Sequence, residues 1–265
     1  MKRRTVLTIA GSDPSGGAGI QADLKTMTAM GIYGMSVITA LTVQNTTGVY
    51  GIRDVEPALI ADQMDCVFTD IVPDAVKVGM VSRRETIVTI ARKLEEYGAR
   101  HVVLDPVMVS SSGRRLLAED AMEVLTEQLL PLAEVITPNL PEAEILCGRD
   151  LEDEAGMEAA ARQLGEAFRC FALVKGGHRT GTADDVLYGE GTVIWFRGRR
   201  IANPNTHGTG CTLSSAIACG LAGGRSVKES VRQAKQYLSA ALESGLDLGR
   251  GSGPLDHCVG IAGRF

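Results

Sequence analysis

The chain has 265 residues, of which 45% are hydrophobic, 22% charged and 4% aromatic, and its formal net charge is -5. Such a composition is typical of a soluble globular protein. The negative charge and the scarcity of aromatic rings argue against a nucleic-acid partner, which would call for clustered Lys and Arg. The first apolar run is interrupted at residues 11–13, too early for a signal or membrane segment, so we expect a cytoplasmic protein with no membrane partner.

The six cysteines include no Cys-x-x-Cys pair, and there are only four histidines. These spacings fit neither a zinc site nor a disulfide framework. No linker, low-complexity stretch or solenoid repeat divides the chain. We therefore predict a single domain over residues 1–265 with reduced thiols.

Short β-branched segments alternate with longer amphipathic ones. Strands are predicted at residues 6–10, 36–43, 75–78, 101–105, 135–137 and 171–175, and helices at 20–30, 58–69, 84–96, 118–129, 142–147 and 154–168. This alternation predicts an α/β fold with a mainly parallel sheet covered on both faces. Residues 184–188 and 193–197 are predicted to form an antiparallel hairpin at the sheet edge, followed by helices at 211–221 and 227–245.

A glycine-rich turn before the predicted helix at 211–221 is the most informative motif. Gly208 and Gly210 permit close backbone approach, and the start of the helix adds free N–H groups and the positive end of its dipole. We predict an anion hole here. Cys211 lies within it, so the thiol is a candidate acid, base or nucleophile with a depressed pKa, or else a small packing residue.

Polar and small residues follow several predicted strands, where parallel strands would bring them to one edge of the sheet. Asp105, Asn139 and Glu142 offer oxygen ligands for Mg²⁺, although Asn139 and Glu142 would each alone suit a helix cap. Lys175 could reach nucleotide phosphates. Together with the anion hole, these residues favour phosphoryl transfer.

Two other chemistries compete with this one. Residues 17–22 fit the G-x-G-x-x-A dinucleotide fingerprint, but the next strand leads into Gln44 rather than an acidic residue for the ribose. A cysteine hydrolase with Cys211 as nucleophile and His207 or His178 as base stays open, although no third group is identifiable that would orient the imidazole.

Seven blocks of sequence carry a resemblance that covers almost the whole chain. They read AGSDPSGGAGIQAD (10–23), VQNT (43–46), KVGM (77–80), LDPVM (104–108), TPNLPEA (137–143), VKGGH (174–178) and HGTGCT (207–212), and GPLDH (253–257) follows them. In this order they resemble the hydroxymethylpyrimidine/phosphomethylpyrimidine kinases of thiamine biosynthesis, a branch of the ribokinase-like superfamily.

The resemblance implies a three-layer αβα ribokinase-like fold and an enzyme that uses ATP and Mg²⁺. It implies two successive phosphorylations of 4-amino-5-hydroxymethyl-2-methylpyrimidine. By motif match, the residues that hold the pyrimidine or shape its pocket are Gln44, Asp23, Gly11, Met80 and Val107. Those that act on phosphate and metal are Lys175, Asp105, Asn139, Glu142, Gly208, Thr209, Gly210 and Cys211.

Some features stay open at this stage. Some bacterial pyridoxal kinases share this branch and its cysteine, so pyridoxal or pyridoxamine is an alternative to the pyrimidine substrate. The expected partners are small-molecule substrates. The sequence leaves open whether the chain also forms a homodimer. Residues 110–115 are small, polar and basic behind a predicted strand end, and they form either a flap over the site or a surface loop.

Overall fold

The computed structural model describes residues 3–109, 116–177 and 182–261. The predicted flap at 110–115 and His178 lie outside these ranges. Within them, no helix is long and apolar enough to cross a membrane.

The described strands form one sheet in the order β3-β2-β1-β4-β5-β6-β7-β8-β9. The strands are β1 Thr5–Ser12, β2 Tyr33–Asn45, β3 Gly48–Asp54, β4 Ala75–Val78, β5 Val102–Leu104, β6 Val135–Ile136, β7 Phe171–Lys175, β8 Asp185–Gly189 and β9 Thr192–Phe196. Strands β2, β1, β4, β5, β6 and β7 are parallel. The antiparallel strands β3, β8 and β9 lie at the two edges.

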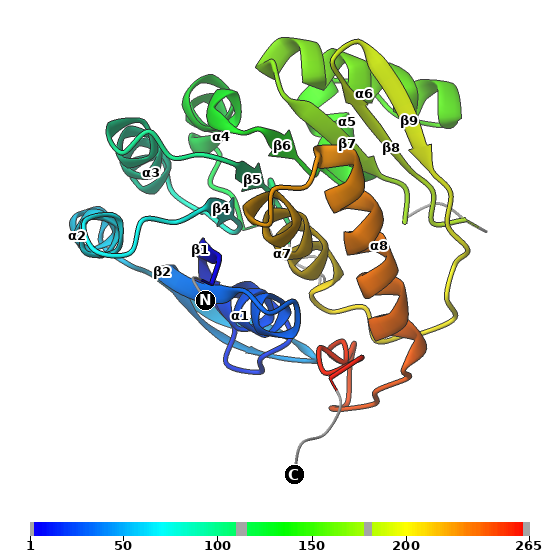
Figure 1. The fold of residues 1–265 in the computed structure, drawn as a ribbon, viewed down its shortest axis with the longest axis horizontal. Helices are drawn as coiled ribbons and strands as arrows, with labels where there is room; N and C mark the ends of the chain where they lie inside the picture. Colours follow the sequence, from blue (N-terminus) through cyan, green and yellow to red (C-terminus); the bar gives the residue numbers. More distant parts are fainter. Residues whose placement is uncertain (1–2, 110–115, 178–181, 262–265) are drawn as a thin grey trace.

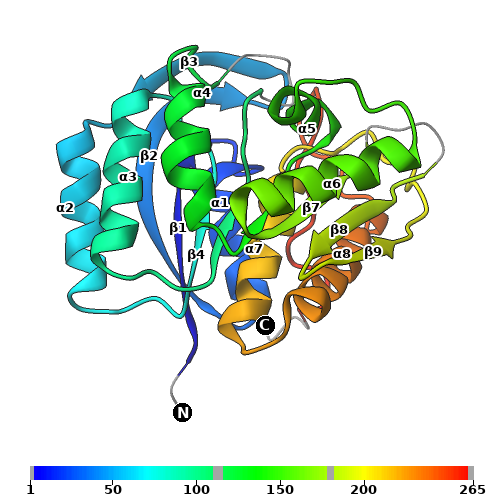
Figure 2. The same ribbon diagram turned by 90° about the horizontal axis from the view of Figure 1, so that it is seen from above.

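Helices cover both faces of the sheet (Figure 1). They are α1 Gly19–Ala29, α2 Pro57–Phe68, α3 Arg84–Glu96, α4 Ala121–Val124, α5 Leu140–Cys147, α6 Glu154–Phe168, α7 Thr209–Ala222 and α8 Val227–Glu243, with a π-helix η1 Leu125–Leu129 and a 3-10 helix η2 Leu130–Leu132. Helices α2 to α6 share one apolar core with the sheet, and α1, α7 and α8 share the other. Figure 2 shows α2, α3 and α4 side by side on the first of these faces.

The period-two pattern of the strands produces these two cores. In β1, Leu7 and Ile9 belong to the core under α2 to α6, whereas Val6 belongs to the core under α1, α7 and α8. The neighbouring strands β4 and β5 alternate in the same way. The predicted fold class, a three-layer α/β fold with a mainly parallel sheet and an antiparallel edge hairpin, is confirmed.

Two local predictions differ from the structure. Strand β2 continues through Gln44 to Asn45 and pairs with β3. The sequence analysis did not predict β3, because Gly48 and Gly51 interrupt any apolar pattern in it. The predicted helix at 118–129 begins later, at Ala121, widens into the π-helix η1 and ends in the tighter 3-10 helix η2, which contains Pro131. Proline has no N–H for the helical ladder and clashes with the preceding turn, so a regular α-helix cannot run through it.

Candidate active site

Helix α7 begins at Thr209, two residues before the predicted start, and Gly208 is its N-cap. Gly208 has φ +84°, and a Cβ there would lie 1.8 Å from the Gly17 carbonyl oxygen, so only glycine fits. The first intrahelical bond runs from Thr212 N to the Gly208 oxygen, at 2.9 Å. The N–H groups of Gly210 and Cys211 therefore precede the helical ladder, as in an anion-binding helix start.

The end of β5, the end of β7 and the start of α7 meet at one point. Lys175 Nζ lies 2.8 Å from Asp105 Oδ1. A Cβ on Gly210 would lie 3.1 Å from Asp105 Oδ2 and 3.4 Å from Lys175 Nζ. Burial lowers the pKa of Lys175, but the Asp105 and Glu142 carboxylates together outweigh it and raise the pKa above its ordinary value. The structure thus brings together a cation, a carboxylate and the predicted anion hole.

Asn139 and Glu142 form a capping box at the start of α5. The Asn139 side chain accepts from Glu142 N at 2.9 Å, and Glu142 Oε2 accepts from Asn139 N at 2.8 Å. Burial raises the pKa of Glu142 to about 7, Lys175 lowers it and the Asp105 carboxylate raises it further. These two residues therefore have a structural role beside the metal role predicted for them.

The carboxylates at this edge suit a divalent cation by their chemistry. Asp105 Oδ1 is bonded to Lys175 and to Thr137 Oγ1, at 3.0 Å from the latter, and Oδ2 faces the start of α7. Asp105 and Glu142 repel each other electrostatically, as the Glu142 pKa shows. Among the described residues, no three His, Cys, Asp or Glu side chains gather closely enough to hold a metal ion. Mg²⁺ would thus need water and phosphate oxygens besides these carboxylates.

Cys211 does not have the depressed pKa expected from its place at a helix start. Burial raises the pKa of the thiol to about 11; Lys77 opposes this, while the Asp23 and Asp105 carboxylates add to it. The thiolate expectation is therefore wrong for the free protein, because burial and the two carboxylates outweigh the Lys77 ammonium. The expectation of a cysteine hydrolase loses support as well, since Nε2 of His207, the proposed base, lies within hydrogen-bond distance of Asp13 and Gln44.

Lys77 is a buried charge beside this thiol that the sequence analysis missed. Its ammonium and the Asp23 carboxylate are both fully buried and 2.9 Å apart. Asp23 also accepts from Thr8 Oγ1 at 2.6 Å and from Ser215 Oγ at 2.7 Å. Burial lowers the pKa of Lys77, and the negative charge around it, that of Asp23 above all, more than offsets this. The lysine within the apolar strand β4 was the available signal.

The other predicted substrate residues are divided between neighbouring elements. A Cβ on Gly11 would lie 3.2 Å from Met80 Sδ, so these two residues are adjacent. Val107 N donates to the backbone carbonyl oxygen of Asp105 at 2.8 Å in the turn after β5. Gln44 contacts His207 instead. Asp23, predicted as a pyrimidine ligand, is fully buried in its ion pair with Lys77.

Asp13 joins the loop after β1 to the start of α7, and it too was missed. Its Oδ2 accepts from Gly17 N at 3.1 Å and Ala18 N at 2.8 Å, and it lies 2.8 Å from His207 Nε2. Burial raises the pKa of Asp13, but hydrogen bonds led by that from His207 lower it to about 2. An acidic residue before a glycine-rich loop was the available signal.

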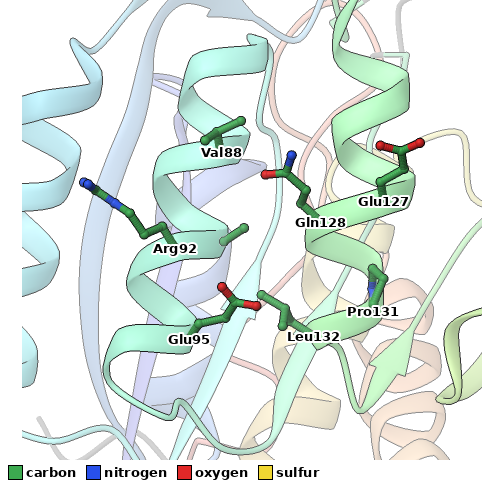
Figure 3. Close-up of a pocket in the computed structure, with 8 residues that line it drawn as sticks. Val88, Arg92, Glu95, Glu127, Gln128, Pro131 and Leu132 are labelled. Atoms are coloured by element: carbon green, nitrogen blue, oxygen red, sulfur yellow. The ribbon is translucent and has the colours of Figure 1, made fainter.

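Two cavities lie away from this edge, and no predicted site residue lines either. One of about 280 Å³ lies between α3 and residues 127–132, with Arg92, Glu95 and Glu127 among its lining side chains (Figure 3). The other, of about 420 Å³, is formed by residues 201–205 and the end of α8.

Residues 13–256 match the family described as phosphomethylpyrimidine kinase, and the chain belongs to this family. It is 52% identical over 255 residues to a hydroxymethylpyrimidine/phosphomethylpyrimidine kinase of Rhizobium meliloti, covering 95% of this chain and 96% of that protein. A thiamine biosynthesis bifunctional protein of Geobacter sulfurreducens is 53% identical over 258 residues, 97% of this chain. The chain spans about half of the length of that relative, 53%.

Solved structures agree with this assignment. The phosphomethylpyrimidine kinase of Clostridium difficile superposes with a TM-score of 0.81 at 46% identity, covering 89% of this chain and 98% of that one. The pyridoxal kinase of Staphylococcus aureus in complex with AMP-PCP superposes with a TM-score of 0.91 at 33% identity, covering 98% and 96%. The predicted ribokinase-like kinase is confirmed at the level of fold and family.

Proposed function

We propose that this chain transfers the terminal phosphoryl group of ATP to the hydroxymethyl group of 4-amino-5-hydroxymethyl-2-methylpyrimidine, and then phosphorylates the resulting monophosphate. The observation that carries the proposal is the meeting of Asp105, Lys175 and the start of α7 at one point. A partly buried cation beside free N–H groups suits a migrating phosphoryl group, whose negative charge they stabilise.

In this proposal the Gly208–Cys211 turn, including Thr209 and Gly210, holds the migrating phosphoryl group. Lys175 neutralises nucleotide phosphate, as its raised pKa keeps it charged. Asp105 and Glu142, with Asn139 nearby, are the residues that would hold Mg²⁺, which when bound screens phosphate charge. Mg²⁺ dependence is therefore part of the proposal.

Cys211 acts in this proposal through its proton rather than as a preformed thiolate. With a pKa of about 11 the free thiol is protonated near neutral pH. Phosphoryl transfer passes through a loose transition state that needs little prior deprotonation of the alcohol. Late in the reaction the Cys211 thiol gives its proton to an oxygen of the transferred phosphoryl group and takes up the hydroxymethyl proton, which restores the thiol. The neighbouring Lys77 ammonium favours the transient thiolate.

The pyrimidine pocket in this proposal consists of Gln44, Gly11, Met80 and Val107, with Asp23 supporting it from beneath through Lys77. An amide offers both a donor and an acceptor, as an aminopyrimidine edge requires. Leaving part of a buried amide unpaired costs about 1–3 kcal/mol. We therefore expect pyridoxal or pyridoxamine to be poor side substrates, by roughly ten- to hundredfold.

A paired assay of ATP consumption tests this function with three substrates: hydroxymethylpyrimidine, its monophosphate and pyridoxal. The proposal expects the highest kcat/KM with the pyrimidines. A higher value with pyridoxal, toward which the Staphylococcus aureus structure points, would make pyridoxal kinase the function. An inert monophosphate would remove the second phosphorylation.

The proposal also includes a single domain, a cytoplasmic location and a homodimer. Sedimentation of the purified chain tests whether it forms a dimer.

A further inference from the structure

We propose that His207 is a positioning residue that, with Asp13 and Thr42, holds the side-chain amide of Gln44 in one orientation and so selects the ring substrate. The selectivity part of this inference rests on the function proposed above. The orientation part rests only on contacts within the protein. Gln44 on β2 is partly buried between His207 and Thr42.

The Asp13 side determines which nitrogen of His207 carries a proton. Both side chains are buried, and His207 Nε2 lies 2.8 Å from Asp13 Oδ2. Asp13 is ionised, since its pKa is lowered to about 2, and an ionised carboxylate can only accept. Nε2 of His207 therefore carries a hydrogen and donates it mainly to Asp13 Oδ2, so this nitrogen has no lone pair with which to accept from Gln44.

The Thr42 side is determined in the same way. Thr42 Oγ1 donates its only hydrogen to the Ser12 carbonyl oxygen, at 2.9 Å. The end of the Gln44 amide drawn as Oε1 lies 3.2 Å from this hydroxyl. Because the hydroxyl has no second hydrogen, it can only accept from Gln44. Gln44 thus faces a donor on one side and an acceptor on the other.

Only one orientation of the Gln44 amide satisfies both neighbours. With its nitrogen toward His207 Nε2, at 3.2 Å, the amide would set donor against donor there and acceptor against acceptor at Thr42. A half-turn about the last side-chain bond exchanges oxygen and nitrogen without changing the shape. The carbonyl oxygen then faces the Nε2–H of His207 and shares its one hydrogen with Asp13 Oδ2 in a three-centre bond, and the NH₂ group donates to Thr42.

A fixed amide makes the site selective. One N–H and one oxygen lone pair of Gln44 stay available, on known sides of the group. An aminopyrimidine offers a ring nitrogen as acceptor beside an amino group as donor, which matches this pair. Pyridoxal has no amino group, and a clamped amide cannot turn to suit it. Releasing the clamp should therefore weaken pyrimidine binding more than pyridoxal binding.

The protonation state is tested without any substrate. The ¹⁵N resonances of the four histidines are recorded in the free protein, and His207 is assigned by its loss in the His207→Gln variant. We expect Nε2 of His207 to carry the proton. A neutral ring protonated on Nδ1 alone would overturn the proposal, whatever the activity of the enzyme.

Selectivity is tested with two variants of similar polarity. In His207→Gln, the NH₂ group can take the place of the Nε2 donor, so the ratio of kcat/KM for hydroxymethylpyrimidine over pyridoxal should stay within about twofold of the wild type. The shorter Asn side chain of His207→Asn cannot reach both Asp13 and Gln44. There we expect the ratio to fall roughly tenfold through a higher KM for the pyrimidine. Equal ratios in the two variants would refute the clamp.

The chain offers a matched control. His101 Nδ1 and Glu134 Oε2 form a second histidine–carboxylate pair, 2.7 Å apart, at the opposite ends of the strands. Glu134→Gln disturbs that pair and should leave the ratio unchanged. If wild-type protein phosphorylates neither pyrimidine, the proposed function fails, whereas the ¹⁵N measurement still decides the orientation of Gln44.

Discussion

The two faces of the sheet differ in what the central strands present to them. Toward α2 to α6, the buried side chains that strands β1, β4 and β5 contribute are those of an apolar core: Leu7, Ile9, Val76, Val78, Val102 and Leu104. Toward α1 and α7, the same strands also present Thr8 and Lys77, which meet Asp23 and Ser215 in a fully buried polar cluster. Buried polar groups of this kind cost free energy unless each is paired. Both faces thus contain an apolar core, but only the second also contains this polar cluster, which lies beneath α7.

The polar face explains why α7 can carry a site. Its Ala, Ser and Gly residues let the helix pack closely over the sheet, and Ser215 bonds directly to Asp23. The Ser215–Asp23 bond holds α7 one turn after Gly210 and Cys211. The contrast between the two faces leads to four predictions: the first compares the faces directly, and the others test groups on or beside the polar face.

The largest effect is expected from Lys77→Met, which leaves the Asp23 carboxylate buried without its cation. We expect a loss of about 3–5 kcal/mol in the free energy of unfolding, measured by urea denaturation. Ile9→Val on the apolar face should cost only about 0.5–1.5 kcal/mol. A double variant, Asp23→Leu with Lys77→Met, should regain more than half of the loss. A Lys77→Met cost below that of Ile9→Val would remove the distinction between the faces.

His257 makes the stability of the polar face depend on pH. It is buried against Thr212 of α7, at 3.0 Å, and burial lowers its pKa from 6.5 to about 4. Because the pKa is lower in the folded state, this stability is present above pH 6.5 and is lost as the pH falls through 4. The full difference is about 3 kcal/mol.

Unfolding of the wild type and of His257→Gln between pH 7 and pH 4 measures this effect. The Gln variant keeps a polar partner for Thr212 and should lose less stability on acidification. His101→Gln, at a partly exposed site, serves as the control. Parallel pH profiles for the wild type and His257→Gln would contradict the prediction.

Turnover should depend on one of two cysteines in α7. Cys211→Ala should keep ATP binding but lower kcat by roughly a hundredfold, because the proton relay is gone. Cys219 lies on the same helix, deeply buried, and burial raises its pKa to about 12. Cys219→Ala should leave kcat within about twofold. Wild-type turnover in Cys211→Ala would leave that thiol with only a packing role.

Sequence patterns predicted the parts of the molecule that local chemistry determines. Glycine spacing predicted the start of α7, and apolar periodicity predicted β4, α3, α6 and β7 with their observed bounds. The contacts of Asp13 with His207, 194 residues apart, could not be predicted, since they arise only when β1 and α7 meet. The Cys211 pKa was mispredicted for a similar reason. The burial of Cys211 and its proximity to Lys77 and Asp23 depend on how distant segments pack together, so the motif alone could not predict them.

The smallest effect expected concerns Asp105, whose charge is shared between Lys175 and the metal proposed here. Asp105→Asn removes one of two carboxylates that would hold Mg²⁺, so the Mg²⁺ concentration for half-maximal activity should rise about tenfold. Thr137→Val is the matched control, because it removes the hydroxyl bonded to Asp105 Oδ1 but leaves the carboxylate. Its Mg²⁺ curve should match the wild type. An unchanged Mg²⁺ curve in Asp105→Asn, with kcat lowered, would assign Asp105 to positioning Lys175 rather than to the metal.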